Sequence, residues 1–158
     1  MLKRFLAGFR KEAPAAGPSI ASLQDEVVRS IAADRTDLHD GEWEGREWLH
    51  IAVNHEVLVE EGKRSSTQAI VLACKRGGPL EDLSFRLSRE SKQKILDLRD
   101  AMSADGNAPF TIADIAIERD GHYDFAFSYD PPPRLNGDLL HTPLKGLLER
   151  YKAEKGFA

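Results

Sequence analysis

The chain has 158 residues, of which 41% are hydrophobic and 30% charged, and its formal net charge is −4. These proportions are typical of a folded globular protein and exclude an intrinsically disordered chain. No apolar run approaches the ~20 residues that cross a bilayer, so we expect no transmembrane segment. The single cysteine, Cys74, excludes a disulfide within the chain; we expect a small core residue and a cytoplasmic protein.

Residues 1–18 are predicted to form a unit of their own, an amphipathic helix over residues 1–11 and a Pro/Ala/Gly linker over residues 13–18. The unit has four basic residues and one acidic residue, a net charge of +3 that leaves −7 for the rest of the chain. Two interpretations are open: the helix folds onto the body, or it docks on a membrane surface or a partner. Its apolar stripe consists of Leu2, Phe5, Leu6 and Phe9.

Residues 19–158 are predicted to form a single globular α+β domain. It begins with a helix whose apolar stripe runs from Ile20 to Ile31, with Ser19 or Ser22 as its N-cap. Alternating apolar residues then predict strands, separated by polar turns. These strand candidates are residues 48–53, 57–59 and 68–74.

The clearest helix begins after the N-cap Ser88 and extends to Met102. A β-hairpin follows, because residues 110–118 and 122–129 flank an Asp-Gly pair that tolerates the positive φ of a tight turn. Four aromatic residues alternate on its second strand, which predicts that they face the core. They are Tyr123, Phe125, Phe127 and Tyr129.

Three consecutive prolines at residues 131–133 predict an extended segment, and a last helix is expected between the N-cap Thr142 and Gly156. The order of these elements predicts an α+β fold. We expect an antiparallel sheet of about four to six strands covered by helices, with helices at both ends of the chain.

Catalytic patterns are scarce, and we expect no enzyme activity, cofactor or metal. The chain has no Gly-rich phosphate loop or nucleophile elbow, and one cysteine cannot form a cysteine-based zinc site. The one compact candidate is His122 with Asp124, which could share a proton or a metal on one strand face. The alternative is a turn histidine beside a solvent-facing aspartate. The aspartates around the aromatic strand also argue against nucleic-acid binding.

Short acidic clusters are the main surface pattern, and one of them encloses a tryptophan, Trp43, between Glu42 and Glu44. Tryptophan is frequent in interface hot spots, and neighbouring carboxylates steer a basic partner towards it. Two interpretations of Trp43 stay open, an interface anchor or a cover for the sheet edge. Trp48 is expected to anchor the first strand.

The segment from residue 94 to 130 combines a Leu98-Arg99 pair at a helix end, an Asp120-Gly121 hairpin and a closing Tyr-Asp pair. This combination resembles the YezG-like immunity protein family, small antitoxin-like proteins that protect bacteria from toxins. The resemblance covers about residues 20–130 and is strongest over this segment. It implies an α+β fold, no catalytic residues and a toxin as the partner.

The predicted function is therefore a bacterial immunity or antitoxin protein that binds a basic toxin, for which a nuclease would suit the acidic body. An alternative is an accessory protein docked to a membrane or complex through residues 1–11. A hydrolase that uses His122 and Asp124 is a third interpretation. The partner-binding residues predicted for the first function are Glu42, Trp43, Glu44, Asp124 and Asp130.

Overall fold

The computed structural model describes residues 18–156, so the predicted helix of residues 1–11, with Leu2, Phe5, Leu6 and Phe9, lies outside the described residues. The elements in chain order are α1 (Ile20–Asp34), β1 (Glu47–Leu58), β2 (Arg64–Cys74), β3 (Glu81–Ser84), α2 (Arg89–Met102), β4 (Ile112–Glu118), β5 (Tyr123–Ser128), the 3-10 helix η1 (Arg134–Asn136) and α3 (Leu147–Lys155).

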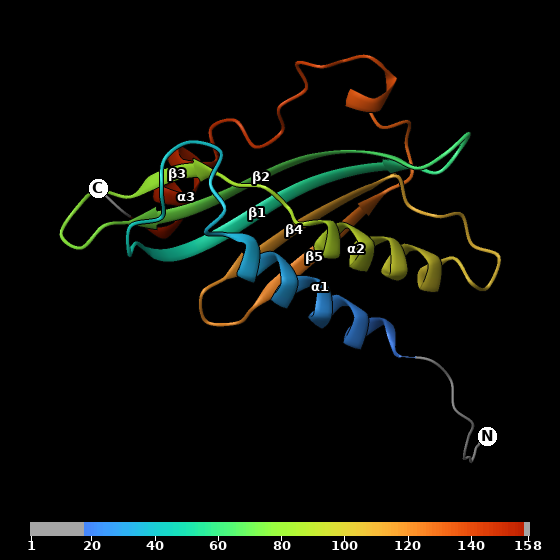
Figure 1. Ribbon diagram of the computed structural model, residues 1–158, viewed down its shortest axis with the longest axis horizontal. Helices are drawn as coiled ribbons and strands as arrows, with labels where there is room; N and C mark the ends of the chain where they lie inside the picture. The colour runs from blue at the N-terminus through green and yellow to red at the C-terminus, as the bar shows by residue number, and fades with distance from the viewer. Residues whose placement is uncertain (1–17, 157–158) are drawn as a thin grey trace, which may run out of the picture.

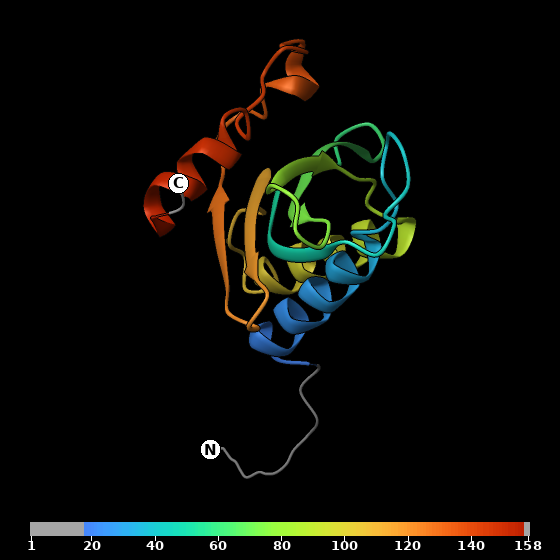
Figure 2. The same ribbon diagram turned by 90° about the vertical axis from the view of Figure 1, so that its left-hand side faces the viewer.

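The five strands form one antiparallel sheet in the order β3-β2-β1-β4-β5. Helices α1 and α2 lie side by side on one face of the sheet, which we call the helix face (Figure 1). Residues 131–156, the C-terminal arm, include η1 and α3 and lie on the other face, the outer face (Figure 2). The predicted α+β fold with an antiparallel sheet of four to six strands is confirmed.

Both helices on the helix face begin at a serine that caps the backbone. The side chain of Ser19 accepts the N–H of Ser22, and that of Ser88 accepts the N–H of Ser91. Each bond satisfies an N–H group that the first helical turn leaves without a partner. The structure thus confirms Ser88 and selects Ser19 over Ser22 as the first cap.

The core lies between the helices and the sheet. Alternate residues of the strands point into it, such as Ile51 of β1 and Ile115 of β4, and meet Ile31 of α1 and Leu98 of α2. Full burial of such a side chain stabilises the fold by about 1.5–3 kcal/mol. Arg99, beside Leu98, reaches from α2 to the start of β4, where its Nε donates to the carbonyl of Phe110 at 2.7 Å.

The β4–β5 hairpin forms as predicted, with Gly121 in the turn at a φ of 101°. Phe125 and Phe127 pack against the core cluster, and the ring centroid of Phe127 lies 4.7 Å from that of Phe110. Tyr123 packs there as well. Tyr129 does not, because it follows the end of β5 and is 55% exposed; its predicted core position is wrong.

Two predicted boundaries are also wrong. The predicted strand 48–53 and residues 57 and 58 of the predicted strand 57–59 belong to one strand, β1, which ends at Leu58. The two predicted pieces are continuous because Asn54, His55 and Glu56 are buried between them with polar partners. The last helix begins at Leu147 and not at Thr142, after Gly146 has turned the chain at a φ of 81°. Strand β3 was not predicted, since it has only four residues and one large apolar side chain.

Candidate partner-binding edge

The sheet is incomplete along the outer edge of β2. Strand β3 pairs only with residues 70–73 of β2, and the N–H of Phe85 adds one bond to the carbonyl of Ala69 at 3.1 Å. From Arg64 to Gln68, β2 has a neighbouring strand on the β1 side alone. We call this stretch, residues 64–68, the open edge of β2.

Backbone groups point outward at alternate residues of this edge. The carbonyl of Ala69 faces away from β1, so the backbone groups of Thr67 and Ser65 face the same way, because successive residues of a strand alternate. Within residues 18–156, the outward N–H and C=O of Ser65 and Thr67 make no backbone hydrogen bond. A row of unpaired groups of this kind is a template for a further strand.

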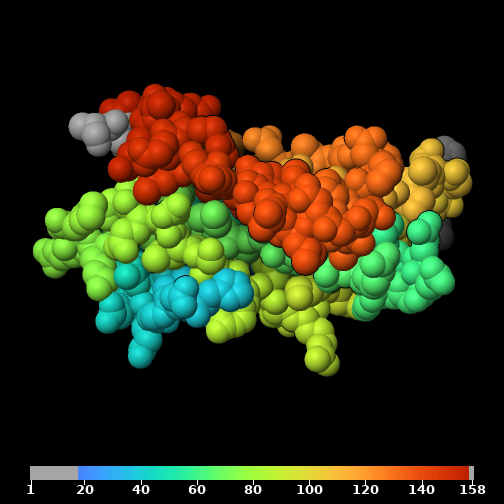
Figure 3. All heavy atoms as spheres, turned by 90° about the horizontal axis from the view of Figure 1, so that it is seen from above, coloured from blue at the N-terminus to red at the C-terminus, as the bar shows by residue number. Residues whose placement is uncertain are grey.

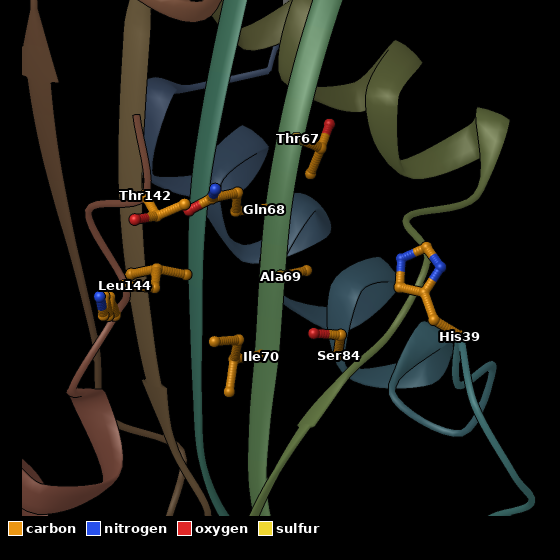
Figure 4. Close-up of a pocket in the computed structure, with 9 residues that line it drawn as sticks. His39, Thr67, Gln68, Ala69, Ile70, Ser84, Thr142 and Leu144 are labelled. Atoms are coloured by element: carbon orange, nitrogen blue, oxygen red, sulfur yellow. The ribbon is translucent and has the colours of Figure 1, made fainter. Parts of the chain in front are cut away.

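A cavity of about 390 Å³ lies at this edge (Figure 4). The side chains of Gln68 and Ile70 point to the side of Leu144, whereas those of Thr67 and Ala69 point to the side of His39. The cavity can therefore receive side chains from both faces of an added strand. It is lined by His39, Thr67, Gln68, Ala69, Ile70, Ser84, Thr142, Leu144 and Lys145.

The wall on the outer face is the C-terminal arm, which a buried arginine attaches to the sheet. Arg134 Nη1 lies 3.5 Å from Glu56 Oε2, and the side chains are 6% and 0% exposed. The same guanidinium donates to Ser66 Oγ at 2.8 Å and to the carbonyl of Asn54 at 3.1 Å. Burial lowers the pKa of Arg134, and the charge of Glu56 opposes this change. Arg134 thus fixes η1 over β1 and β2.

The arm continues along the open edge from this attachment. The carbonyl of His141 accepts Gln68 Nε2 at 3.1 Å and Arg134 Nη1 at 3.3 Å. The two residues before it, Leu139 and Leu140, are 79% and 87% exposed. Contacts of η1 hold the segment before the two leucines, and those of the His141 carbonyl hold it after them. The leucines therefore form an exposed apolar surface on an anchored segment.

The predicted cluster of Glu42, Trp43 and Glu44 lies in the α1–β1 loop, at the end of β2 opposite to the open edge. Glu44 is 2.7 Å from Lys75, which follows β2, and this hydrogen bond lowers the pKa of Glu44. In Figure 3 the red and orange arm lies on one side of the β2 edge and the cyan loop on the other. Glu42 is exposed and has no ion pair in the described part of the chain.

Trp43 is half-buried and packs against the core cluster. The guanidinium of Arg35 lies 5.7 Å from the ring of Trp43 and 5.5 Å from that of Trp48. This cation–π arrangement orders the loop and leaves part of Trp43 accessible. The buried part of Trp43 is compatible with a cover for the sheet edge, and its accessible part is compatible with an interface anchor.

The other predicted residues, Asp124 and Asp130, lie at the opposite edge of the sheet. Asp124 is exposed on β5, and Asp130 follows its end. Four inter-strand spacings separate β3 from β5, about 19 Å. The structure therefore does not bring Asp124 and Asp130 to Glu42, Trp43 and Glu44. The loop of Glu42–Glu44 itself lies at the far end of β2 from the open edge, since Lys75 is seven residues, or ~23 Å, beyond Gln68.

The predicted pair of His122 and Asp124 is not joined by a contact. His122 Nδ1 instead lies 3.0 Å from Asp120 Oδ1, and both side chains are largely exposed. The hydrogen bonds from His122 lower the pKa of Asp120. Within residues 18–156, no group of three or more His, Cys, Asp or Glu side chains has a geometry that could hold a metal ion.

Comparison with protein-family models and with curated protein sequences finds no match to this chain. None of the helices in the described chain is both long and apolar enough to span a membrane. The open edge of β2 was missed by sequence reasoning. Its one signal is the break at residues 77–79, Gly-Gly-Pro, followed by a segment with too few apolar residues for a long strand.

Proposed function

We propose that this protein is a binding module that takes an extended segment of a partner protein onto the open edge of β2. The observation that carries the proposal is the set of outward backbone groups of Ser65 and Thr67 beside a cavity. Two N–H and two C=O groups there have no backbone partner in the part of the chain that the structure describes. Each new backbone hydrogen bond would contribute about 0.5–1.5 kcal/mol to binding.

We further propose that the partner is a basic toxin and that the module acts as an immunity or antitoxin protein. The resemblance of residues 94–130 supports this role, and so does the net charge of −7 beyond residue 18. Asp40 and Glu42, near the cavity-lining His39, are exposed and have no ion pair among residues 18–156. Free carboxylates at that position would steer a basic partner to the edge.

The test of strand addition is Thr67→Pro compared with Thr67→Val. Both variants lose the hydroxyl that forms a hydrogen bond with His55 Nδ1. Only proline also removes the outward backbone N–H and obstructs an added strand. Each protein would be used to capture partners from a lysate of the source organism. The captured chain would then be purified and its affinity measured by calorimetry.

We expect the wild type and Thr67→Val to bind the purified partner, and Thr67→Pro to bind at least about tenfold more weakly. Amide NMR spectra would verify that both variants keep the β1–β2 pairing. Equal affinity of the two variants would refute strand addition at this edge.

The toxin role needs a separate test. The captured partner would be expressed in a bacterial host with and without this protein. Growth arrest by the partner alone, relieved by wild type but not by Thr67→Pro, is the expected result. A harmless partner would refute the immunity role and leave the binding mode standing. Weaker binding at high salt is expected if the partner is basic.

A further inference from the structure

A second cavity, of about 370 Å³, lies on the helix face between α2 and the β1–β2 hairpin. Its polar lining side chains are cationic or neutral, and no carboxylate lines it. The lining residues are His55, Val57, Lys63, Ser65, Arg89, Lys92, Gln93 and Leu96. The protein as a whole has a net negative charge, but the lining of this cavity has a net positive charge.

The three cations of this cavity are Lys63, Arg89 and Lys92. None of them forms an ion pair with a carboxylate of residues 18–156. Lys94, on the same helix, differs, because its Nζ lies 3.4 Å from Glu26 and 4.0 Å from Glu90. Three converging cations without counter-charges repel one another, and an anion between them would relieve that repulsion.

His55 supplies a buried neutral group at the same cavity. Its side chain is 1% exposed, and its Nδ1 lies 2.8 Å from Thr67 Oγ1. Burial, followed by the charges of Lys92 and Arg134, lowers the pKa of His55 to about 4, so the ring is neutral at pH 7. Its Nε2 makes no hydrogen bond within the described chain. When Nδ1 accepts the threonine proton, Nε2–H is a free donor.

We propose that this cavity binds a small phosphate monoester, with its phosphate between Lys63, Arg89 and Lys92. A phosphate dianion matches several cations better than a carboxylate does, since it has more charge and more acceptor oxygens. The site goes beyond the proposed function, because it lies on the other side of β2 from the arm and requires no partner strand.

The neutral lining defines the rest of the ligand. His55, Ser65 and Gln93 can donate hydrogen bonds to phosphate oxygens. Val57 and Leu96 provide an apolar wall against which a small organic group would pack. The volume of the cavity is that of small-molecule sites in general. The expected ligand is therefore an ester with a compact apolar body, and not free phosphate.

Calorimetric titration of the full chain with three probes tests this proposal. The probes are phenyl phosphate, inorganic phosphate and benzoate. We expect phenyl phosphate to bind most tightly, because it alone has both the dianion and the apolar body. Equal affinity for inorganic phosphate would overturn the ester, and equal affinity for benzoate would overturn the phosphate specificity.

Matched variants on α2 locate the site. Lys92→Gln is expected to weaken phenyl phosphate binding by about tenfold, whereas Lys94→Gln changes the net charge equally and should leave it within twofold. Arg89→Gln is a second test variant. Because the side chain of Arg89 is exposed, its replacement should not unfold the protein, so weaker binding would report on the site itself. Equal weakening by Lys92→Gln and Lys94→Gln, or no effect of Lys92→Gln and Arg89→Gln, would overturn the site. Perturbation of the His55 ring resonance by phenyl phosphate is the expected independent readout.

Discussion

The guanidinium of Arg134 and the carboxylate of Glu56, which are far apart in the sequence, form a buried ion pair with 3.5 Å between Nη1 and Oε2. Glu56 Oε1 also accepts the backbone N–H of Leu135 at 3.0 Å. One carboxylate in β1 thus holds both the side chain and the backbone of η1. The position of the C-terminal arm, and with it one wall of the edge cavity, depends on this pair.

Replacement of Arg134 by methionine is expected to destabilise the fold by about 3–5 kcal/mol, because the buried charge of Glu56 loses its counter-charge. Urea unfolding measures the free energy. The control is Arg119→Met, whose ion pair with Glu47 is exposed and should contribute about 0–1 kcal/mol. The double variant Glu56→Met/Arg134→Met should recover part of the loss. No recovery would show that the ion pair is not the cause.

Asp34 connects the end of α1 to the start of α2. Its Oδ2 accepts the N–H and the hydroxyl of Ser88, at 2.9 and 3.0 Å, and the hydroxyl of the fully buried Ser91. Asp34→Ala should destabilise the protein by about 2–4 kcal/mol, because it leaves these donors without a charged acceptor. Asp37→Ala removes only a 3.9 Å surface pair with Arg86 and should cost under ~1 kcal/mol. Thermal and urea unfolding would separate the two variants.

The low pKa of His55 predicts a pH dependence of stability. Its pKa is about 4 in the folded state and 6.5 in the reference state, so the unfolded chain binds the extra proton between these values. Stability is therefore lost as the pH falls from 6.5 to 4, by about 3 kcal/mol from this group. His55→Gln should flatten that part of the profile of unfolding free energy against pH. An unchanged slope between pH 6.5 and 4 in His55→Gln would refute this contribution of His55.

Replacement of Leu139 and Leu140 is expected to lower the affinity for the partner without changing the stability of the fold. Because they are 79% and 87% exposed, the double change to serine should alter the free energy of unfolding by less than ~0.5 kcal/mol. If the partner contacts the arm beside the open edge, its affinity should fall by about tenfold. Val59→Ser, at an exposed residue of the β1–β2 turn, is the matched control. Unchanged affinity of the leucine variant would remove the arm from the interface.

Much of the fold follows from local patterns that the structure retains. The serine caps, the Asp-Gly turn and the alternation of Phe125 and Phe127 each have a local cause, so a single sequence is sufficient to predict them. The continuity of β1 is different. Asn54, His55 and Glu56 interrupt the apolar pattern, and their burial depends on partners that are 12 to 80 residues distant in the chain.

The candidate site was harder to predict for a similar reason. An open edge is a property of how far β3 pairs along β2, and a strand sequence does not show where its neighbour ends. The acidic loop could be found from Glu42, Trp43 and Glu44, but its distance from Asp124 follows from the order of the strands. Lys63 and Lys92 likewise converge only because the hairpin and α2 enclose one cavity.

The strand at the far edge of the sheet, β5, has a consequence for how the molecule behaves at high concentration. It too has a neighbour on one side only, which exposes it to pairing with another copy. Asp124 and Asp130 lie along that strand and just beyond it, so two copies meeting there would oppose carboxylates with carboxylates. Like-charge pairs of this kind would disfavour edge-to-edge pairing through β5, whereas residues 64–68 of β2 include a single charged residue, Arg64.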